Sequence, residues 1–203
     1  MRDWSKLADK QTVEDAVSKL KERGIDATFV QTSQEAKNKV LQLIPEGSRV
    51  LTSQSETSNA IGIPEIIDNS GKYVSVRKEY MSFDHETQAD KIRIARAIPD
   101  YIVASVHAVT KNGEVMIASN TGSQLAAYAY GAGKVIWIIG TQKFVENLEE
   151  GFKRIYDYVL GLESERLKKV YGVPSNVSKI LIIDKETVKG RITAIFVNEV
   201  LGF

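Results

Sequence analysis

The sequence predicts an α/β fold in which helices cover both faces of a mostly parallel, mixed sheet. Segments with the apolar spacing of helices alternate with short β-branched segments, the pattern of strands joined by crossover helices. Residues 134–140, KVIWIIG, are almost continuously apolar, as expected for a strand buried on both faces. Asn112-Gly113 is a strong signal for a tight β-hairpin, which adds an antiparallel pair to the sheet.

The first part of the chain has the pattern of helix, strand, helix and strand. Residues 12–24 carry apolar side chains at helical spacing and end at a glycine, and residues 25–32 follow as a strand. Ser33 is placed to cap a second helix, which ends at Pro45, and residues 48–53 form the next strand. We expect a single domain over 1–203, with residues 1–45 as an N-terminal extension of helices and a strand packed on it.

The rest of the chain continues the alternation. The expected elements are a helix through 66–67, a strand at 72–76, a helix from Asp84 to Pro99, strands at 100–110 and 114–119, a capped helix at 120–133, the strand at 134–140, a long helix at 145–162, and strands at 179–184 and 191–201. In the strand at 100–110, the two-residue period places His107 on one face with Val103, Ser105 and Val109.

Composition excludes several classes of function. The 27 basic and 26 acidic residues give a net charge of +1, so neither nucleic acid nor a membrane surface is an expected partner. The absence of cysteine excludes disulfides, thiolate nucleophiles and cysteine-bound zinc or iron–sulfur clusters in this chain. With two histidines, one of them in the solvated DHE at 84–86, we expect no metal site and no cofactor. No signal-peptide or membrane-spanning run is visible, so we expect a soluble cytoplasmic protein.

Hydroxyl side chains crowd the segment that follows the strand at 48–53. Ser53, Ser55 and Thr57 precede an apolar helical pattern, where unpaired backbone N–H groups attract an anion. Glu56 works against an anion at the same place. The alternative is plain helix capping, although capping needs fewer hydroxyls than this segment offers.

Two more segments lie where strands are expected to end. Asn120, Thr121 and Gly122 begin the helix after one strand, and Gly140 and Lys143 follow the most apolar strand. Ligands of open parallel sheets bind at the carboxyl ends of strands, so these residues are candidate ligand-binding positions. The alternatives are an ordinary capped helix and a solvated lysine.

Catalytic candidates are fewer. Ser105 is a further ligand-binding candidate, and Ser105 or His107 could orient the ligand or move a proton. A satisfied, partly buried histidine is the more frequent case, and no carboxylate stands at a spacing that would complete a triad. Glu56 is the carboxylate that a stand-alone enzyme would use in this segment. No G-x-G-x-x-G follows any strand, which argues against a dinucleotide site.

Three long segments resemble the LUD domain of lactate-utilisation proteins. They are SQSETSNAIGIPEII at 53–67, the run from Asp100 to Val145 containing SVHAVT and IGTQK, and KILIIDKETVKGRITAIFVNEVLGF at 179–203. The resemblance implies a fold like that of ribose-5-phosphate isomerase, glucosamine-6-phosphate deaminase and the CoA transferases, whose members bind phosphosugars or CoA thioesters at these strand ends. The chain lacks the glycines of the isomerase phosphate loop and the catalytic carboxylates of both groups.

The resemblance also implies a role. Lactate-utilisation complexes contain a subunit with iron–sulfur clusters, and this cysteine-free chain resembles the cluster-free type. It is therefore expected to take part in lactate oxidation to pyruvate, to bind a small anionic metabolite and to work with iron–sulfur redox partner subunits. Two alternatives stay open: a stand-alone isomerase or acyl/CoA transferase, and a non-catalytic assembly subunit that is homo-oligomeric through the long helix around Phe152.

Overall fold

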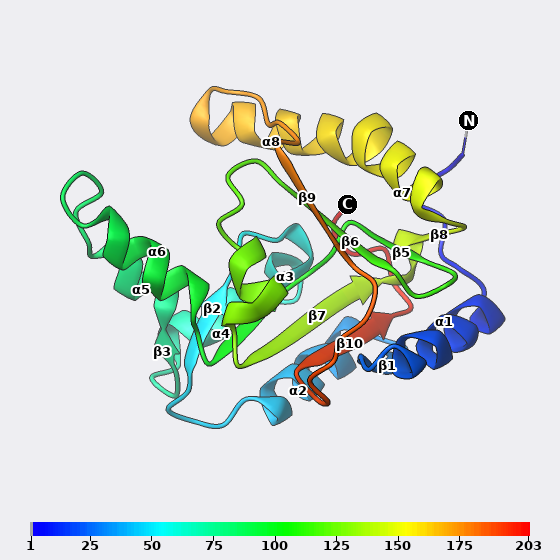
Figure 1. The fold of residues 1–203 in the computed structure, drawn as a ribbon, viewed down its shortest axis with the longest axis horizontal. Coiled ribbons are helices and arrows are strands. Elements are labelled where there is room, and N and C mark those ends of the chain that lie inside the picture. The colour runs from blue at the N-terminus through cyan, green and yellow to red at the C-terminus, as the bar shows by residue number, and fades with distance from the viewer. Residues whose placement is uncertain (1) are drawn as a thin grey trace.

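A six-stranded parallel sheet forms the centre of the molecule (Figure 1). The computed structural model describes residues 2–203. In sheet order the strands are β1 (Asp26–Val30), β10 (Ile192–Val197), β7 (Lys134–Gly140), β4 (Tyr101–Ala104), β2 (Arg49–Thr52) and β3 (Val74–Ser75). Every pairing in this sheet is parallel, so the carboxyl ends of all six strands lie at one edge. The predicted α/β fold is confirmed.

Helices cover both faces of this sheet, and the two-residue period of the strands explains how. In β7, Val135, Trp137 and Ile139 face one layer, while Ile136 and Ile138 face the other. The first layer contains α1 (Lys10–Glu22), α5 (Val76–Met81), α6 (Ala89–Ala97) and the π-helical turn η1 (Ala127–Gly131). The second layer contains α2 (Ser33–Leu43) and α4 (Ile63–Asn69). Both layers are apolar at the sheet, which makes burial their main source of stability.

A second, four-stranded sheet packs on the first layer. Its order is β8 (Phe144–Val145), β5 (Ala108–Thr110), β6 (Val115–Ser119) and β9 (Lys179–Ile183). β6 runs antiparallel to both β5 and β9, whereas β8 is parallel to β5. The antiparallel pairs therefore lie in this second sheet, and the prediction that they belong to the central sheet is wrong.

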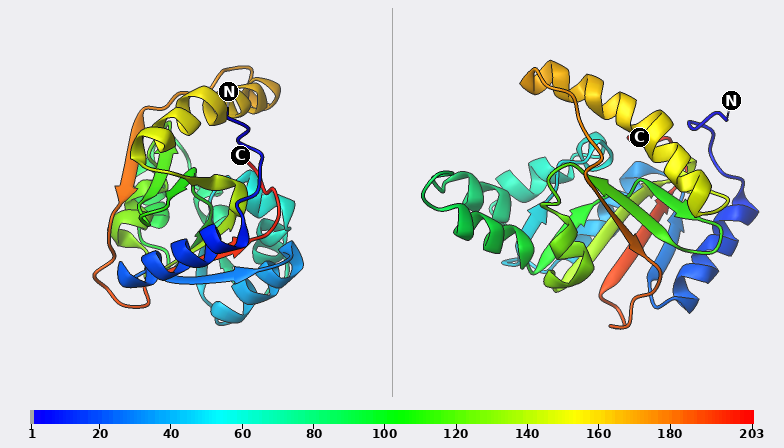
Figure 2. Two further views of the ribbon diagram at one scale, coloured as in Figure 1. Left: turned by 90° about the vertical axis from the view of Figure 1, so that its right-hand side faces the viewer. Right: turned by 45° about the horizontal axis from the view of Figure 1, so that its top comes forward.

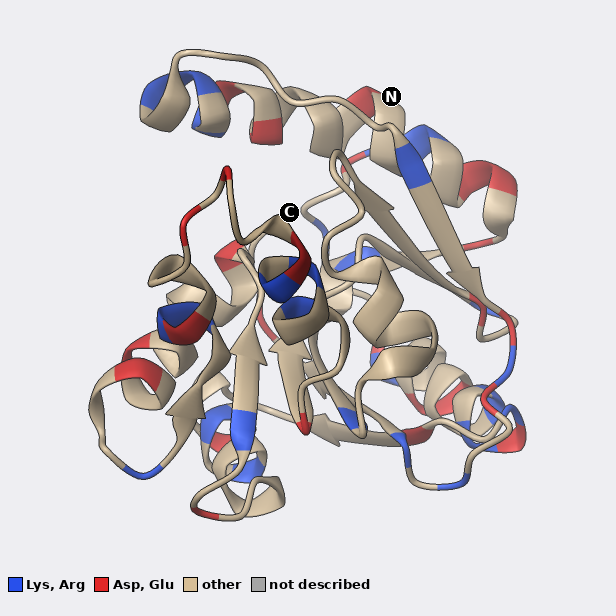
Figure 3. Cartoon of the chain, turned by 60° about the vertical axis from the view of Figure 1, so that its left-hand side comes forward, with Lys and Arg blue, Asp and Glu red and all other residues tan. Residues whose placement is uncertain are grey.

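A long helix lies over the outer face of the small sheet (Figure 2). It consists of α7 (Leu148–Arg154), a π-helical turn η3 (Ile155–Val159) and α8 (Leu160–Tyr171). Ala108 and Met116 of the small sheet pack against Ile155 of this helix. Figure 3 shows basic and acidic residues interspersed along the helix, where Lys153 pairs with Glu149 one turn away. Its outer surface therefore has no single sign of charge.

The predicted strand at 100–110 is wrong as a single element. β4 ends at Ala104 and β5 begins at Ala108, and these two strands belong to different sheets. Ser105, Val106 and His107 form the crossing between them, so His107 does not lie on a strand face with Ser105. β-branched and small apolar residues continue through the crossing, and the sequence pattern therefore hides it.

Four predicted helices differ in extent. The long helix predicted at 145–162 runs from Leu148 to Tyr171. The helix after Ser53 is divided into α3 (Glu56–Ala60) and α4 by Gly62, whose φ of 72° ends the first turn. The predicted helix from Asp84 starts instead at Ala89, because the Asp84 side chain closes a separate turn by accepting from the N–H of Thr87. The helix predicted at 120–133 has no regular residues before 125.

The N-terminal elements join the same sheet and core. β1 pairs in parallel with β10, and α1 buries Val13, Ala16 and Leu20 in the main apolar cluster. Within residues 2–203, none of the helices combines the length and the apolar character that crossing a bilayer would require.

Candidate functional site

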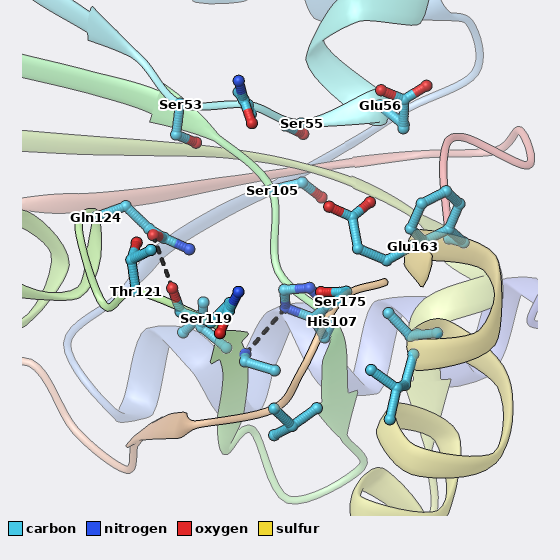
Figure 4. Close-up of a pocket in the computed structure, with 18 of the residues that line it drawn as sticks. Ser53, Ser55, Glu56, Ser105, His107, Ser119, Thr121, Gln124, Glu163 and Ser175 are labelled. Carbon is cyan, nitrogen blue, oxygen red and sulfur yellow. Dashed lines mark hydrogen bonds between the residues drawn. The ribbon is translucent and has the colours of Figure 1, made fainter. Parts of the chain in front are cut away.

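A cavity of about 430 Å³ lies between the long helix and the carboxyl edge of the central sheet. Most of its lining comes from the β2–α3 loop, the β4–β5 crossing, the end of β6 with the turn after it, the inner side of the long helix, and residues 173–177. Arg96, Tyr128, Lys143 and Phe203 complete it. Figure 4 shows Ser53 and Ser55 on one side and Ser119, Thr121 and Gln124 on the other. The cavity therefore brings together two of the three predicted segments and the lysine of the third.

The β2–α3 loop supplies Ser53, Ser55, Glu56 and Thr57 to the cavity wall. Ser55 is the N-cap of α3 and accepts from the N–H of Ser58 at 3.3 Å, so the capping alternative holds for this residue. Thr57 is buried and donates its hydroxyl proton to the carbonyl of Leu201 at 2.9 Å. Ser55 and Thr57 therefore form hydrogen bonds within the protein while they also line the cavity.

Lys143 is buried at the floor of the cavity, and the alternative of a solvated lysine is wrong. β7 ends at Gly140, and the short 3₁₀ turn η2 (Thr141–Lys143) directs the chain back under the loop. The Lys143 Nζ lies 3.0 Å from Thr57 Oγ1, and 3.1 Å from both Ser105 Oγ and the carbonyl oxygen of Val106. The lysine therefore joins the β2–α3 loop to the β4–β5 crossing.

No carboxylate of residues 2–203 forms an ion pair with Lys143. Burial lowers the pKa of the Lys143 amine well below its usual value, and the positive charge of Arg154 lowers it further. Arg154 is itself fully buried behind the cavity wall and donates to the carbonyl of His107 at 2.6 Å. Its Nε and Nη2 have no hydrogen-bond partner among the described residues. The floor of the cavity is thus basic without a compensating acid.

His107 lies in the β4–β5 crossing and faces the same cavity (Figure 4). Its Nδ1 accepts a hydrogen bond from the N–H of Ala118 at 3.1 Å. Burial lowers the pKa of His107 to about 3, and the positive charges of Lys143 and Arg154 act in the same direction. The ring is therefore neutral near pH 7 with its proton on Nε2, which suits a hydrogen-bond donor better than a general base.

The turn after β6 holds Ser119, Asn120, Thr121 and Gln124 at the cavity. Ser119 accepts from the N–H of Gly122 at 2.9 Å and donates to Gln124 Oε1 at 3.1 Å. Because regular helical geometry starts only at 125, Asn120 and Thr121 present side-chain groups and not a helix N-terminus. Thr57 and Thr121 nevertheless line the same cavity.

Gly122 and Gly140 do not line the cavity. Gly122 has a φ of 81° and packs against the side chain of Lys179, so it shapes the turn. Gly140 lies against the carbonyl of Glu199 and the N–H of Leu201, where it allows the end of β7 to pass the C-terminal segment. Both glycines therefore have structural reasons for their place.

Sequence reasoning missed Arg96, which lines the cavity from α6. Its Nη2 donates to Ser123 Oγ at 2.7 Å, its guanidinium stacks over the ring of Tyr80 at 4.7 Å, and its buried Nε has no partner. No ion pair joins Arg96 to a carboxylate within 2–203. The helical period of this segment indicates only that Arg96 borders the buried Ala95, and no local pattern indicates a cavity beside it.

The long helix closes the other side with Glu163 and Arg166, which sequence reasoning also missed. Arg166 binds both oxygens of Glu163 at 2.7 Å and lies 3.8 Å from a carboxylate oxygen of Glu56. The Gln54 amide donates to the Tyr171 hydroxyl at 3.2 Å. These contacts tie the β2–α3 loop to the long helix across the cavity.

Within 2–203, no group of three or more histidine, aspartate or glutamate side chains is arranged to hold a metal ion.

Phe152 and Tyr156 lie one turn apart on the long helix and are 37% and 49% exposed. Oligomerisation through this helix stays a prediction.

Comparison with known proteins identifies relatives of this chain. The LUD domain family model matches residues 13–197. The crystal structure of a DUF162 family protein from Deinococcus radiodurans is similar, with a TM-score of 0.60 and 10% identity over 95% of this chain and 100% of that chain. At this identity the likeness concerns the fold alone. No curated protein matches the sequence.

Two other structures share only part of the architecture. The β subunit of eIF2B from Chaetomium thermophilum has a TM-score of 0.35 and 15% identity, covering 57% of this chain and 43% of that chain. The δ subunit from the same organism has a TM-score of 0.34 and 15% identity, covering 70% and 57%. Both scores are too low to support an inference, whereas the family match spans almost the whole chain. This chain belongs to the LUD domain family.

Proposed function

We propose that the cavity binds a small anionic metabolite, and that the chain serves the oxidation of lactate to pyruvate. It would act as a cluster-free component whose electron carriers lie on iron–sulfur partner subunits. Membership of the LUD domain family is consistent with a role associated with lactate utilisation. The absence of cysteine supports the placing of any cluster on a partner.

One observation carries the ligand part of this proposal: Lys143 and Arg96 line the cavity, and neither forms an ion pair within 2–203. The Arg96 guanidinium is only partly exposed, and its buried Nε has no hydrogen-bond partner, so an anion beside it would replace the solvation that burial removes. The third cationic side chain of the wall, Arg166, is already paired with Glu163. A carboxylate or phosphate in the cavity would supply the missing partner for Arg96.

The size of the cavity sets the range of ligands. A volume of about 430 Å³ falls within the roughly 300–1,000 Å³ of small-molecule sites. A three-carbon acid would leave part of this space to water, so sugar phosphates and the CoA group belong in the same ligand screen as lactate and pyruvate.

Isothermal titration of the full chain with lactate, pyruvate, a sugar phosphate and CoA tests the proposal. A charge-assisted hydrogen bond contributes about 1.5–3 kcal/mol, so Arg96→Met should weaken binding by roughly 10- to 100-fold. Arg93→Met is the matched control, because Arg93 lies on the same helix but is exposed and pairs with Asp90. Equal affinities for wild type and Arg96→Met, or no binding of any of the four, would contradict the proposed site.

A stand-alone isomerase or acyl/CoA transferase is the second candidate. It needs a carboxylate in the cavity, and Glu56 and Glu163 both line the wall. Arg166 pairs with Glu163 at 2.7 Å and lies 3.8 Å from Glu56, so both carboxylates have a cation beside them. Turnover of a phosphorylated or CoA-linked substrate by the purified chain would favour this candidate over the lactate role.

A further inference from the structure

The Lys143 amine lies among uncharged groups at the wall of the cavity. Its neighbours within hydrogen-bond distance are two hydroxyls and one backbone carbonyl. Lysines that need their charge for structure are normally paired with a carboxylate or exposed to water. Lys143 has neither, since it is 2% exposed and forms no ion pair within the described chain.

The three oxygen atoms that accept hydrogen bonds from Nζ are all uncharged, so the surrounding chain supplies no negative charge to the amine. Thr57 gives its single hydroxyl proton to Leu201, so Thr57 Oγ1 accepts from Nζ, and the carbonyl of Val106 can only accept. Ser105 Oγ is a third acceptor at 3.1 Å, since the Ser105 hydroxyl donates its own proton to the carbonyl of Val106 at 3.5 Å. When the amine reacts, the Ser105 hydroxyl lies beside the nitrogen, where it can exchange a proton with it.

We propose that Lys143 is a nucleophilic amine that forms an imine with a small aldehyde or ketone carrying an anionic group. The requirement for an anionic group rests on the proposed function, in which Arg96 binds the anion. A lysine that is desolvated and close to another cation is the form of this side chain that reacts with carbonyl compounds near neutral pH. Burial and the charge of Arg154, both of which lower the pKa of Lys143, act in this direction.

The reaction conserves atoms and involves no oxidation. The Nζ lone pair attacks the carbonyl carbon, the carbonyl oxygen takes up a proton, and the resulting carbinolamine loses water to leave a C=N bond. The Ser105 hydroxyl, 3.1 Å from Nζ, is placed to pass the proton from nitrogen to the departing oxygen. One amine and one carbonyl compound thus give one imine and one water.

Reductive trapping of the full wild-type chain tests the proposal without relying on a variant that could fail to fold. The protein is incubated near pH 7 with sodium cyanoborohydride and one of three probes: pyruvate, dihydroxyacetone phosphate or uncharged acetone. Peptide mass mapping then locates the reduced adducts. We expect a single early adduct on Lys143, formed at least about ten-fold faster than on exposed lysines, which are almost fully protonated at this pH. Prior unfolding in urea should abolish this preference.

Two variants sharpen the result. Lys143→Met should remove the early adduct while circular dichroism reports a folded chain. Lys179→Met, which removes a lysine that packs on Gly122 outside the cavity, should leave the adduct unchanged. A wild-type adduct that is absent from Lys143, or that forms no faster there than on surface lysines, would overturn the proposal.

The probes separate this inference from the proposed function. If the phosphate probe reacts faster than the carboxylate probe, or the reverse, the preferred anion is identified. If acetone labels Lys143 as fast as both anions do, the anion requirement is wrong even though the amine is reactive. If lactate or pyruvate binds in the titration but no probe labels Lys143, the binding function stands and the imine proposal fails.

Discussion

The pH dependence of the free energy of unfolding tests whether the His107 ring is buried in the cavity wall. The pKa of this histidine falls from 6.5 to about 3 in the folded chain. Between these two pKa values the histidine is protonated in the unfolded chain but not in the folded chain. The free energy of unfolding therefore falls as the pH drops below 6.5. This contribution is fully present above pH 6.5 and is lost progressively as the pH falls toward 3.

The magnitude follows from the size of the shift. Each pH unit between the two pKa values costs up to about 1.4 kcal/mol for one proton, so lowering the pH from about 7 to about 5 should remove about 2 kcal/mol. His107→Asn should abolish this part of the loss, because the asparagine oxygen can accept from the N–H of Ala118 as Nδ1 does, without taking up a proton.

Urea unfolding at a series of pH values measures the effect. His85→Asn is the control, since it removes the other histidine of the chain, which is exposed and lies outside the cavity. Nitrogen-detected NMR of the imidazole gives an independent readout, with His107 expected to remain neutral at about pH 5 with its proton on Nε2. A His107 ring that titrates near 6.5, or equal pH slopes for wild type and His107→Asn, would refute the burial argument.

Three further substitutions test the packing of the chain. Gly140→Ala should destabilise the chain by roughly 1–3 kcal/mol, since a Cβ would lie 2.6 Å from the carbonyl of Glu199. Gly161→Ala, in open space on α8, should instead stabilise the chain by about 0.5–1 kcal/mol. Urea midpoints that move in the same direction for both variants would contradict this difference. Arg191→Met should lower the free energy of unfolding by about 3–5 kcal/mol, because it leaves the buried carboxylate of Glu186 without its cation. A decrease of less than about 1 kcal/mol in the same assay would show that the ion pair is dispensable.

The central sheet was predictable because apolar and β-branched runs mark its strands in the sequence. Residues 134–140 are apolar throughout, and the helices beside them show clear stripes. The crossing at 105–107 was missed because small and β-branched residues fit either a continuous strand or a passage between two sheets. Only the packing of the second sheet decides between these arrangements.

The candidate site was predictable in part for the same reason. Ser53 and Thr57 follow β2 of the central sheet, so its parallel topology places them at the carboxyl edge. Thr121 follows β6 of the second sheet, and the packing of that sheet brings it to the same cavity. The burial of Lys143 depends on which elements cover it, and no local pattern carries that information. Arg96 and Glu163 come from helices whose position over the sheet edge is a property of the whole fold, and they were therefore missed.

Amide NMR of the uniformly labelled wild-type chain, titrated with pyruvate and with a sugar phosphate, tests most directly whether this cavity binds an anion. If an anion binds there, residues of three separate segments, 53–57, 105–107 and 119–124, should show saturable shifts with one common dissociation constant. Saturating amounts of both compounds that leave these three segments unshifted, or that shift only scattered surface amides, would contradict it.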